Sequence, residues 1–387
     1  MIPKNVYEPL KQFHVKENDL LFTVVGTLGK VAIAQKKDNH SIFSCKNTLL
    51  RSKNINPYYL LSYLNSPIGQ IFSLRGKRGA IQEGLNLSDL KEIGVFLAST
   101  DFQSQMEKLV KKSFGLVNQS KSLYSQAEQL LLSELGLLGW KPKHTLSFVK
   151  NFSNTKESNR FDAEYFQPKF EEIIEAVKKY KGGFDELGNL VKVKKSVEPG
   201  SEAYQENGIP FVRVSNLSKF ELSDNNQQFI SEELYEELKT HQPKQGEILL
   251  SKDATPGMAY YLNEEPQKMI ASGGILRLKI DNKQVLPEYL TLVLNSVIVQ
   301  KQIERDAGGS IINHWRPDQV KATLIPILKN EKQKKIKEFV EKSFSDRKLS
   351  KSLLEISKRG VEMAIEKDEQ ETGKWINIEI GKLEMKF

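Results

Sequence analysis

Histidines, cysteines and glycine-rich loops are the places where this sequence could carry out chemistry. Zinc sites need histidines and cysteines at close spacing, but no such cluster occurs among the five histidines and the single cysteine. The segment GTLGK (26–30) has too short a spacing for a phosphate-binding loop, and no serine or threonine follows its lysine. We expect Cys45 to be a small buried residue rather than a catalytic thiol. The sequence therefore offers no constellation for catalysis or metal binding.

Two short motifs have counterparts in enzymes. The first, NPYY (56–59), is similar to the Asn-Pro-Pro-aromatic tetrapeptide of adenine methyltransferases but lacks the second proline. Because proline is favoured in the first turn of a helix, we interpret this segment as a helix start. The second motif, an E-x-K formed by Glu384 and Lys386, occurs in some nucleases, but here it stands in the tail without a partner acid. Neither motif argues for an enzyme.

The composition is that of an ordinary globular protein with a basic excess. Of 387 residues, 39% are hydrophobic and 27% are charged, which is enough for two or three domains. The net charge of +8 and the pI of about 9.1 favour a polyanionic partner such as nucleic acid. The sequence has no apolar run of about 18 residues that would predict a membrane span, and MIPKNVYEPL lacks the pattern of a signal peptide. Together with the lone cysteine, these features predict a cytoplasmic protein without disulfides.

An internal duplication organises the chain. VYEPLKQFHVKENDLLFT (6–23) aligns without a gap with LYEELKTHQPKQGEILLS (234–251), and six of the positions are identical. Four further pairs of segments follow in the same order in both copies. These pairs are GTLG with ATPG, NPYYLLSYLNS with LPEYLTLVLNS, RGAI with GGSI, and DFQSQMEKLVKKSF with EKQKKIKEFVEKSF. The repeated unit is far longer than a solenoid repeat, so we interpret it as a duplicated domain.

Each copy is predicted to contain a mixed part followed by a long helix. DLLFTVV (19–25) and EILLSK (247–252) are short apolar runs beside glycine or proline turns, which is typical of strands. NPYYLLSYLNSPIGQIF (56–72) has apolar residues at helical spacing. Near-heptad apolar stripes then run through 101–135 and 336–365. A helix of 35 residues spans roughly 52 Å. We expect the two helices to pack together as an antiparallel pair, rather than each on its own globular part.

The second copy carries an ordered set of motifs. It begins with RFDAEYFQPKF (160–170) and continues through GIPFVRVSNL (208–217) and GEILLSKDATPG (246–257) to GGSI and a helix opened by NEKQKKI. This order resembles the target-recognition half of a type I restriction-modification specificity subunit. In that family an R-(F/L)-D-x-x-(Y/F) opening, an I-P-(F/W)-(V/I) strand, a D-(I/L)-L strand with a small-residue turn, and an E-x-Q-x-x-I helix start recur in sequence. The resemblance covers residues 6–138 as one unit and 160–369 as the other.

The resemblance implies an α+β fold with two target-recognition domains, the first one partial, separated by two long antiparallel coiled-coil-like helices. Each domain would read one half of a split sequence in double-stranded DNA. DNA methyltransferase (M) subunits and a restriction/translocase (R) subunit would dock on the chain. These partners would bind S-adenosylmethionine, ATP and Mg²⁺, whereas the chain itself would have no catalytic residue, cofactor or metal. The complex would serve host defence.

The motifs divide the chain into six segments. Rigid helices of the predicted length can hold two recognition modules about one DNA turn, roughly 34 Å, apart. The expected segments are a partial target-recognition domain (1–99), a first spacer helix (100–138), a connector (139–159), a complete target-recognition domain (160–329), a second spacer helix (330–369) and a C-terminal tail (370–387).

Polar and basic residues on the predicted loops are the candidates for DNA contact. Lysine and arginine neutralise phosphates, while arginine, asparagine, serine and threonine read base edges in the groove. We expect Trp315 to be a core residue rather than a base-stacking platform. The candidates in the complete copy are Arg213, Ser215, Asn216, Lys252, Thr255, Arg305, Ser310, Asn313 and His314. The candidates in the partial copy are Thr27, Lys30, Arg75, Lys77 and Arg78.

The first copy lacks the front half of the second. Between Arg160 and Tyr235 the second copy has 75 residues, whereas only six residues precede Tyr7. We therefore expect the first recognition domain to be incomplete, with the strand at 20–25 left without neighbours. Three explanations are open. The chain is a fragment of a rearranged or phase-varied gene, or a separate short polypeptide completes the fold, or two chains pair through their second domains.

Two competing functions belong to other classes. A stand-alone methyltransferase or nuclease would modify DNA without added subunits, and the lack of a catalytic motif argues against it. A purely structural coiled-coil scaffold would not bind duplex DNA even at low salt, where phosphate contacts are strong. The DNA target itself depends on loop geometry that the sequence does not reveal.

Overall fold

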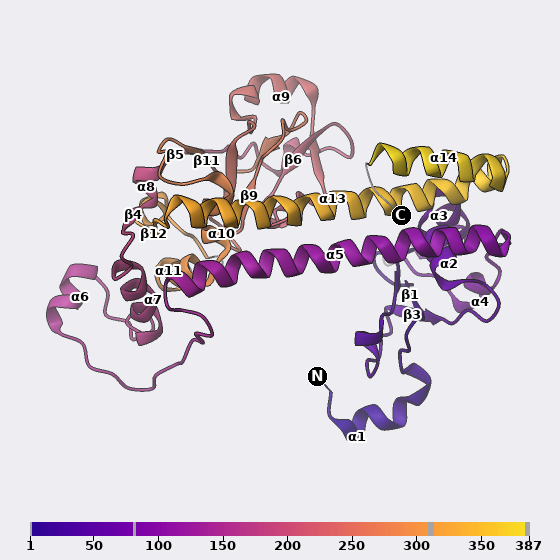
Figure 1. The fold of residues 1–387 in the computed structure, drawn as a ribbon, viewed down its shortest axis with the longest axis horizontal. Coiled ribbons are helices and arrows are strands. Elements are labelled where there is room, and N and C mark those ends of the chain that lie inside the picture. The colour runs from indigo at the N-terminus through magenta and orange to yellow at the C-terminus, as the bar shows by residue number, and fades with distance from the viewer. Residues whose placement is uncertain (1, 80–82, 309–312, 384–387) are drawn as a thin grey trace. The chain divides into compact units, whose positions relative to one another are not determined.

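The computed structural model describes residues 2–79, 83–308 and 313–383 and divides into two units (Figure 1). Unit 1 comprises Met1–Ser120 and Ser345–Phe387, and unit 2 comprises Lys121–Phe344. The mixture of helices and sheets confirms the predicted α+β class. The six-segment division, which gives each long helix a segment of its own, stays a prediction.

Unit 2 is built on a four-stranded antiparallel sheet with the strand order β5-β11-β8-β9. The inner strand β8 is buried along its whole length, because Ile248 and Leu250 pack into one hydrophobic cluster and Leu249 packs into another. The strand predicted at 247–252 is therefore confirmed. The four strands are β5 (Val191–Lys195), β11 (Ile275–Ile280), β8 (Glu247–Ser251) and β9 (Ala259–Tyr261).

Two smaller sheets and seven short helices complete the globular part of unit 2 as described. One sheet joins β10 (Ile270–Ala271), β6 (Ile209–Val212) and β7 (Gln228–Ile230), and the other pairs β12 (Leu324–Pro326) with β4 (Phe184–Glu186). The α-helices are α6 (Phe152–Ser158), α7 (Pro168–Lys178), α8 (Leu187–Leu190), α9 (Glu232–Leu238), α10 (Pro287–Asn295), α11 (Val297–Asp306) and α12 (Pro317–Lys321). Three 3-10 turns lie at Ser201–Ala203, Val214–Asn216 and Lys239–His241.

Unit 1 contains a three-stranded antiparallel sheet in the order β2-β1-β3. Its central strand β1 has a partner on both sides, so the expectation that the strand at 20–25 lacks neighbours is wrong. The two partners come from residues that follow β1 in the chain, not from the front half that only the second copy has. The strands are β1 (Leu20–Thr23), β2 (Val31–Ile33) and β3 (Asn47–Leu50).

The remaining elements of unit 1 are helical. The segment predicted as a C-terminal tail is largely the helix α14, whose Thr372 and Ile376 are buried. Glu384 and Lys386 lie outside the described residues. The helices are α1 (Lys4–Tyr7), the 3-10 turns Glu8–Phe13 and Lys36–Asp38, α2 (Pro57–Asn65), α3 (Pro67–Leu74), α4 (Leu87–Lys91) and α14 (Glu369–Lys382).

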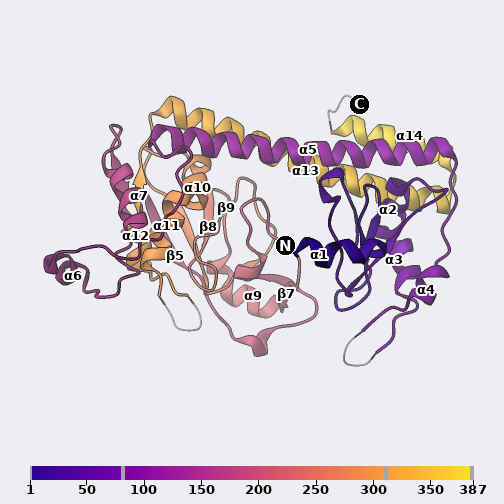
Figure 2. The same ribbon diagram turned by 90° about the horizontal axis from the view of Figure 1, so that it is seen from below.

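The two long helices are α5 (Thr100–Glu134) and α13 (Asn330–Glu366). They pack against each other, as we predicted from their apolar stripes (Figures 1 and 2). Within unit 1 the hydroxyls of Ser113 and Ser350 lie 2.8 Å apart. Within unit 2 Lys332 forms an ion pair of 2.8 Å with Glu134. The residue numbers rise along one helix as they fall along the other, which confirms the antiparallel pair.

Both units repeat the same side-chain clamps, which supports the duplication at atomic detail. The Tyr59 hydroxyl donates to the carbonyl of Phe96 at 2.6 Å, and 230 residues later Tyr289 donates to Pro326 at 2.6 Å. Side-chain amides also tie α2 to β2 and, in the same way, α10 to β9. Others tie α3 to the turn after β1 and α11 to the turn after β8. These clamps are Asn65 to Val31, Asn295 to Ala259, Gln70 to Gly29, and Gln300 to Gly257.

The segment NPYY is a helix start, as interpreted from the sequence. The side chain of Asn56 accepts a hydrogen bond of 2.9 Å from the backbone N–H of Tyr58, and Pro57 occupies the first turn. An asparagine in this position satisfies N–H groups that the helix leaves without partners. The motif therefore has a structural role in α2.

Candidate functional site

Three loops of unit 2 meet at one end of its main sheet. The first follows β8 and contains Lys252, whose N–H donates to Gly274 at 2.9 Å and whose carbonyl accepts from Trp315 at 2.8 Å. The second follows α11, and its Asn313 carbonyl accepts from the N–H of Ala254 at 3.0 Å. The third follows β6, which pairs with β10 just before β11 begins. Six predicted candidates therefore lie at this end of the sheet: Arg213, Ser215, Lys252, Thr255, Asn313 and His314.

The loop after β8 is a tight turn that needs small residues. Ala254 has a φ of 59° and Gly257 a φ of 91°, both in the left-handed region. A Cβ on Gly257 would lie 2.2 Å from the side chain of Ile303, so a larger residue would have to displace that side chain and would also strain the backbone. This geometry leaves Thr255 exposed at the tip of the turn.

The acidic residue Asp253 binds two of the predicted candidates, Lys252 and His314. Asp253 accepts from the ring Nδ1 of His314 at 2.8 Å and also forms an ion pair with Lys252. A phosphate that approaches this corner would compete with the Asp253 carboxylate for the same donors. Lys252 and His314 are thus positioned by Asp253 before any ligand arrives.

The loop after β6 places one candidate outward and one inward. Ser215 is exposed, and Arg213 donates to the carbonyl of Asn226 at 2.7 Å. Asn216, in contrast, is only 1% exposed. Its side chain accepts from the N–H of Arg213 and donates to the carbonyls of Ser223 and Asn225. We therefore correct the expectation for Asn216, because these bonds use its amide to hold the loop instead of presenting it to a base.

Next to these loops lies a hollow of about 590 Å³ whose lining includes three arginines. The ring of Tyr165 has the guanidinium of Arg160 at 4.8 Å and that of Arg305 at 5.3 Å from its centre. Arg160 also binds Asp162 through two hydrogen bonds and holds the pKa of that carboxyl below its usual range. The predicted candidate Arg305 binds Asp306 in the same two-pronged way.

The hollow includes residues that were not among the predicted candidates. Arg316 lines it with an exposed side chain, and Arg160 opens the RFDAEY motif. Asp162 accepts from the N–H of Tyr165 at 3.0 Å, so the motif folds into a compact corner that anchors residue 160 beside α11. The position of Arg160 at the start of a family motif was the available sign of its importance.

The corresponding surface of unit 1 repeats this arrangement. A bridge between Val25 and Gly84 sets the turn after β1 beside the loop after α3, as the bridge between Asp253 and His314 does in unit 2. All five predicted candidates of this copy are exposed. Lys77 pairs with Glu83, and Arg78 pairs with Asp89 at 2.8 Å. The five residues are Thr27, Lys30, Arg75, Lys77 and Arg78.

Three further expectations have different outcomes. Trp315 is 1% exposed and belongs to the core, as predicted. Cys45 stands in the turn that precedes β3 and is exposed. The expectation that it is buried is therefore wrong. Ser310 lies outside the described residues.

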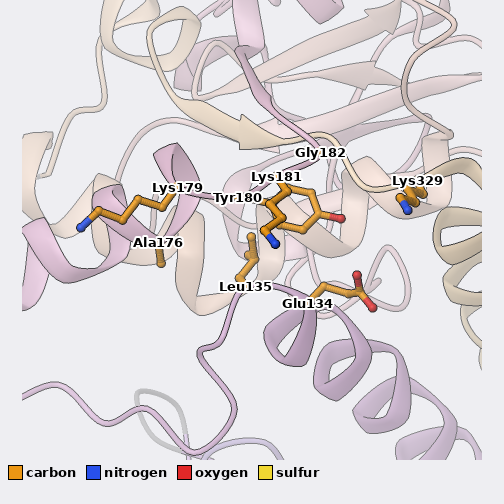
Figure 3. A pocket seen from close by; sticks show the side chains of 8 residues that line it. All are labelled: Glu134, Leu135, Ala176, Lys179, Tyr180, Lys181, Gly182 and Lys329. Carbon is orange, nitrogen blue, oxygen red and sulfur yellow. The ribbon is translucent and has the colours of Figure 1, made fainter.

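A second hollow of unit 2, about 540 Å³ in volume, lies beside the last turn of α5 (Figure 3). Tyr180 and Glu134 line it, together with lysines that include Lys181 and Lys329. Burial is the main cause that raises the pKa of Tyr180. Glu134 already binds Lys332, so this hollow presents no free acid–base pair.

The described part of the chain has no group of three or more histidine, cysteine, aspartate or glutamate residues that could hold a metal ion. No helix in the described ranges is long and apolar enough to cross a membrane. What the site does present is a surface of cations and small polar side chains on three loops.

Comparison with known families identifies the region that carries this surface. Residues 183–356 match the family described as the type I restriction modification DNA specificity domain. This region is similar to the specificity domains of type I restriction-modification systems. The resemblance predicted from the motif order is thereby confirmed.

Relatives of the specificity domain cover different shares of the chain. The type I restriction enzyme EcoBI specificity subunit of Escherichia coli is 30% identical over 115 residues, which are 30% of this chain and 24% of that protein. The putative MjaX specificity subunit of Methanocaldococcus jannaschii is 25% identical over 343 residues, 85% of this chain and 72% of that protein. The match thus spans about a quarter of the EcoBI subunit.

A solved structure aligns over most of the chain. It is the S subunit of a type I restriction-modification system from M. genitalium, with 14% identity and a TM-score of 0.36. The alignment covers 96% of this chain and 84% of that one. At this TM-score, the family assignment rests on the sequence matches.

Proposed function

We propose that the chain is the DNA-specificity subunit of a type I restriction-modification complex and that it binds a bipartite duplex target. The observation that carries the proposal is the surface of unit 2, where the loops after β6, β8 and α11 meet within the specificity domain. Restriction-modification complexes recognise DNA, and this surface offers both phosphate-binding cations and small polar side chains. Unit 1 presents a second surface of the same construction for the other half of the target.

The charged and the small polar residues of the unit 2 surface have different roles in the proposed recognition of DNA. In this proposal Arg213 and Lys252 neutralise phosphates and His314 donates a hydrogen bond to one, which fixes the register on the duplex. The exposed Ser215, Thr255 and Asn313 are small enough to approach base edges in the groove. Because Lys252 and His314 share Asp253, binding requires that phosphate replaces a carboxylate as their partner. We therefore expect marked salt dependence.

The chemistry of the complex belongs to partner subunits in this proposal. DNA methyltransferase (M) subunits would bring S-adenosylmethionine, and a restriction/translocase (R) subunit would bring ATP and Mg²⁺. The chain itself would bind these partner subunits and would not be catalytic. The complex would act in the cytoplasm. The family match of residues 183–356 and the paired helices α5 and α13 support this division of roles.

Duplex binding by the purified chain at low salt tests the proposal. The double variant Arg213→Ala with Lys252→Ala should weaken binding and reduce the slope of log K against log salt by about two, one for each phosphate contact removed. Lys283→Ala is the matched control. Lys283 is an exposed lysine after the far end of β11, whereas the loops of the site lie at the end of the sheet that contains Ser251 and Ile275.

Unchanged affinity of the double variant would refute this assignment of the surface. No duplex binding by the unmutated chain at low salt would favour the structural scaffold instead. Methyl transfer to DNA or DNA cleavage by the chain without partners would identify a stand-alone enzyme and contradict the non-catalytic role.

A further inference from the structure

In unit 2, residues 216–223 of the loop after β6 form a tight hairpin. An antiparallel bridge joins its two arms. The N–H of Ser218 donates to the carbonyl of Glu221 at 3.1 Å, and the Ser218 hydroxyl donates to the same carbonyl at 2.8 Å. These bonds close a turn that has Lys219 and Phe220 at its tip.

The base of this hairpin carries residues that we propose to contact DNA. The Asn216 side chain accepts from the N–H of Arg213 at 3.0 Å and donates to the carbonyl of Ser223 at 2.9 Å. The N–H of Ser223 donates back to the carbonyl of Asn216 at 2.7 Å. Ser215 is exposed beside this network. A movement of the hairpin would therefore move Arg213 and Ser215 with it.

The tip of the hairpin packs against both long helices. The ring of Phe220 meets the ring of Tyr124 on α5 edge to face, with the ring centres 4.9 Å apart. The ring centre of Phe220 also lies 5.9 Å from that of Phe344 on α13. Aromatic rings at these separations attract each other in addition to the area that they bury. Phe220 therefore fastens the tip to α5 and α13.

Lys219 supports the same attachment through its charge. Its ammonium lies 4.5 Å from the ring centre of Tyr124 and 3.9 Å from the carboxylate of Glu128. Burial raises the pKa of Glu128, and the charge of Lys219 opposes that shift. A partly exposed ion pair of this length contributes little energy, so Phe220 is the stronger of the two attachments. Lys219 thus has its partners on α5, whereas Arg213 has the carbonyl of Asn226 within the loop.

The attachment point on α5 is part of the core. Tyr124 is 3% exposed and belongs to the same hydrophobic cluster as Ile248 and Leu250 of β8. It lies inside the helix, well before the last residue, Glu134. A recognition loop that is held by a rigid element keeps its side chains in place for binding.

We infer that α5 and α13 take part in base reading through Lys219 and Phe220, which act as positioning residues and do not touch DNA. By fastening the hairpin tip to the helices, these two residues hold Arg213 and Ser215 where the duplex is read. The long helices would then do more than separate two recognition surfaces. The inference rests on the proposed function in treating the loop after β6 as part of the DNA-binding surface.

Release of the tip should lower base preference and leave the phosphate contacts unchanged. A mobile loop has to be ordered when it contacts a base, and this loss of entropy weakens the specific complex. Non-specific binding depends on the number of phosphate contacts, which stays the same. The affinity ratio between the preferred and a random duplex should therefore fall, while the slope of log K against log salt is kept.

Phe220→Ala in the full chain tests the inference, with Phe152→Ala as the matched control. Phe152 is another phenylalanine of unit 2 and is 65% exposed on α6. The preferred duplex is selected from a randomised library with the unmutated chain and then competed against a random duplex. Phe220→Ala should lower the preference at least about tenfold, whereas the control should keep it. Hydrogen exchange measured by mass spectrometry should become faster in residues 213–227 of Phe220→Ala and stay unchanged in the rest of unit 2.

Lys219→Met is a second variant, because it removes the charge and keeps the length of the side chain. It should lower the base preference by roughly threefold, the scale of a partly exposed ion pair, and keep the salt slope. If Lys219 contacted a phosphate, the slope would instead fall by about one.

The inference is overturned if Phe220→Ala keeps the base preference of the unmutated chain, or if Lys219→Met loses salt slope and keeps the preference. Faster exchange throughout unit 2 would mean a general loss of structure in Phe220→Ala, and the result for Lys219→Met then decides alone. Neither variant alters the predicted loss of affinity in the Arg213 and Lys252 double variant, so this inference can fail while the proposed function stands. Absence of duplex binding by the unmutated chain would refute the proposed function itself.

Discussion

The side chain of Gln333 accepts a hydrogen bond of 2.9 Å from the backbone N–H of Leu286, just before α10 begins. Its amide nitrogen donates to the carbonyl of Leu328 at 2.8 Å. Gln103 does the same in unit 1, where it accepts from Asn56 at 2.8 Å and donates to Ala98 at 2.8 Å. The glutamine of the E-x-Q motif thus fastens the long helix to its recognition module.

Loss of this clamp should destabilise unit 2. We expect Gln333→Ala to lower the free energy of unfolding by about 2 kcal/mol, because it leaves backbone groups in a buried place without partners. Lys334→Ala, an exposed change at the next position of the same helix, should have an effect within about 0.5 kcal/mol. Urea unfolding followed by circular dichroism measures both. Equal stability of the two variants would show that the clamp is not needed.

Two glycines should respond to alanine in opposite directions. Gly257 has a positive φ, and a Cβ there would collide with the side chain of Ile303, so Gly257→Ala should cost more than about 1 kcal/mol. Gly115 lies exposed within α5 with nothing close to an added Cβ, so Gly115→Ala should stabilise the helix by roughly 0.5–1 kcal/mol. Thermal unfolding of both variants checks the signs. A stabilising Gly257→Ala would contradict the turn geometry.

The stability of unit 1 should depend on pH through Glu107. Hydrogen bonds from Lys111 and Asn56 lower the pKa of Glu107 in the folded protein below its ordinary value of 4.5. The charged carboxylate therefore stabilises the fold above that value, and the contribution is lost as the pH falls through the folded pKa.

Glu107→Gln tests this pH dependence. At pH 7 the variant should be less stable by about 0.5 kcal/mol, the scale of a partly exposed pair. The difference from the unmutated chain should shrink as the pH falls below 4.5. Unfolding free energies measured between pH 7 and pH 3 give the comparison. A difference that stays constant across this range would argue against an electrostatic contribution.

The small polar residues of the unit 2 surface should control base preference rather than general affinity. We expect Thr255→Ala and Asn313→Ala to change which duplexes compete best, with a cost of about 1–3 kcal/mol for the preferred base. Their salt dependence should stay that of the unmutated chain, since neither residue carries charge. Competition binding with a randomised duplex library measures both quantities. A reduced salt slope with an unchanged preference would reverse the roles assigned to these loops.

The sequence predicted the features that repeat or have a period. The duplication, the strand EILLS, the helix start at Asn56 and the antiparallel stripes of α5 and α13 all appear in the structure as expected. Each of these features depends on a local pattern or on a comparison of the two copies, and the sequence alone provides both kinds of information.

What the sequence missed depends on long-range contact. The partners of β1 come from downstream segments, so its neighbours could not be inferred from what precedes it. Asn216 stands in a loop and is polar, yet its amide is used by backbone carbonyls up to nine residues away. The RFDAEY motif gave no sign that the ring of Tyr165 would contact the guanidiniums of both Arg160 and Arg305, since 145 residues separate the two arginines.

Genome-wide mapping of methylated adenines would decide whether this chain directs DNA modification. Cells that carry the chain and its methyltransferase partner should modify a defined split sequence, and deletion of the chain should abolish that pattern. Restoration with the Arg213→Ala and Lys252→Ala variant should recover little of it, whereas the Lys283→Ala control should recover it fully. A pattern of methylated adenines that is unchanged after deletion of the chain would contradict its role as a specificity subunit.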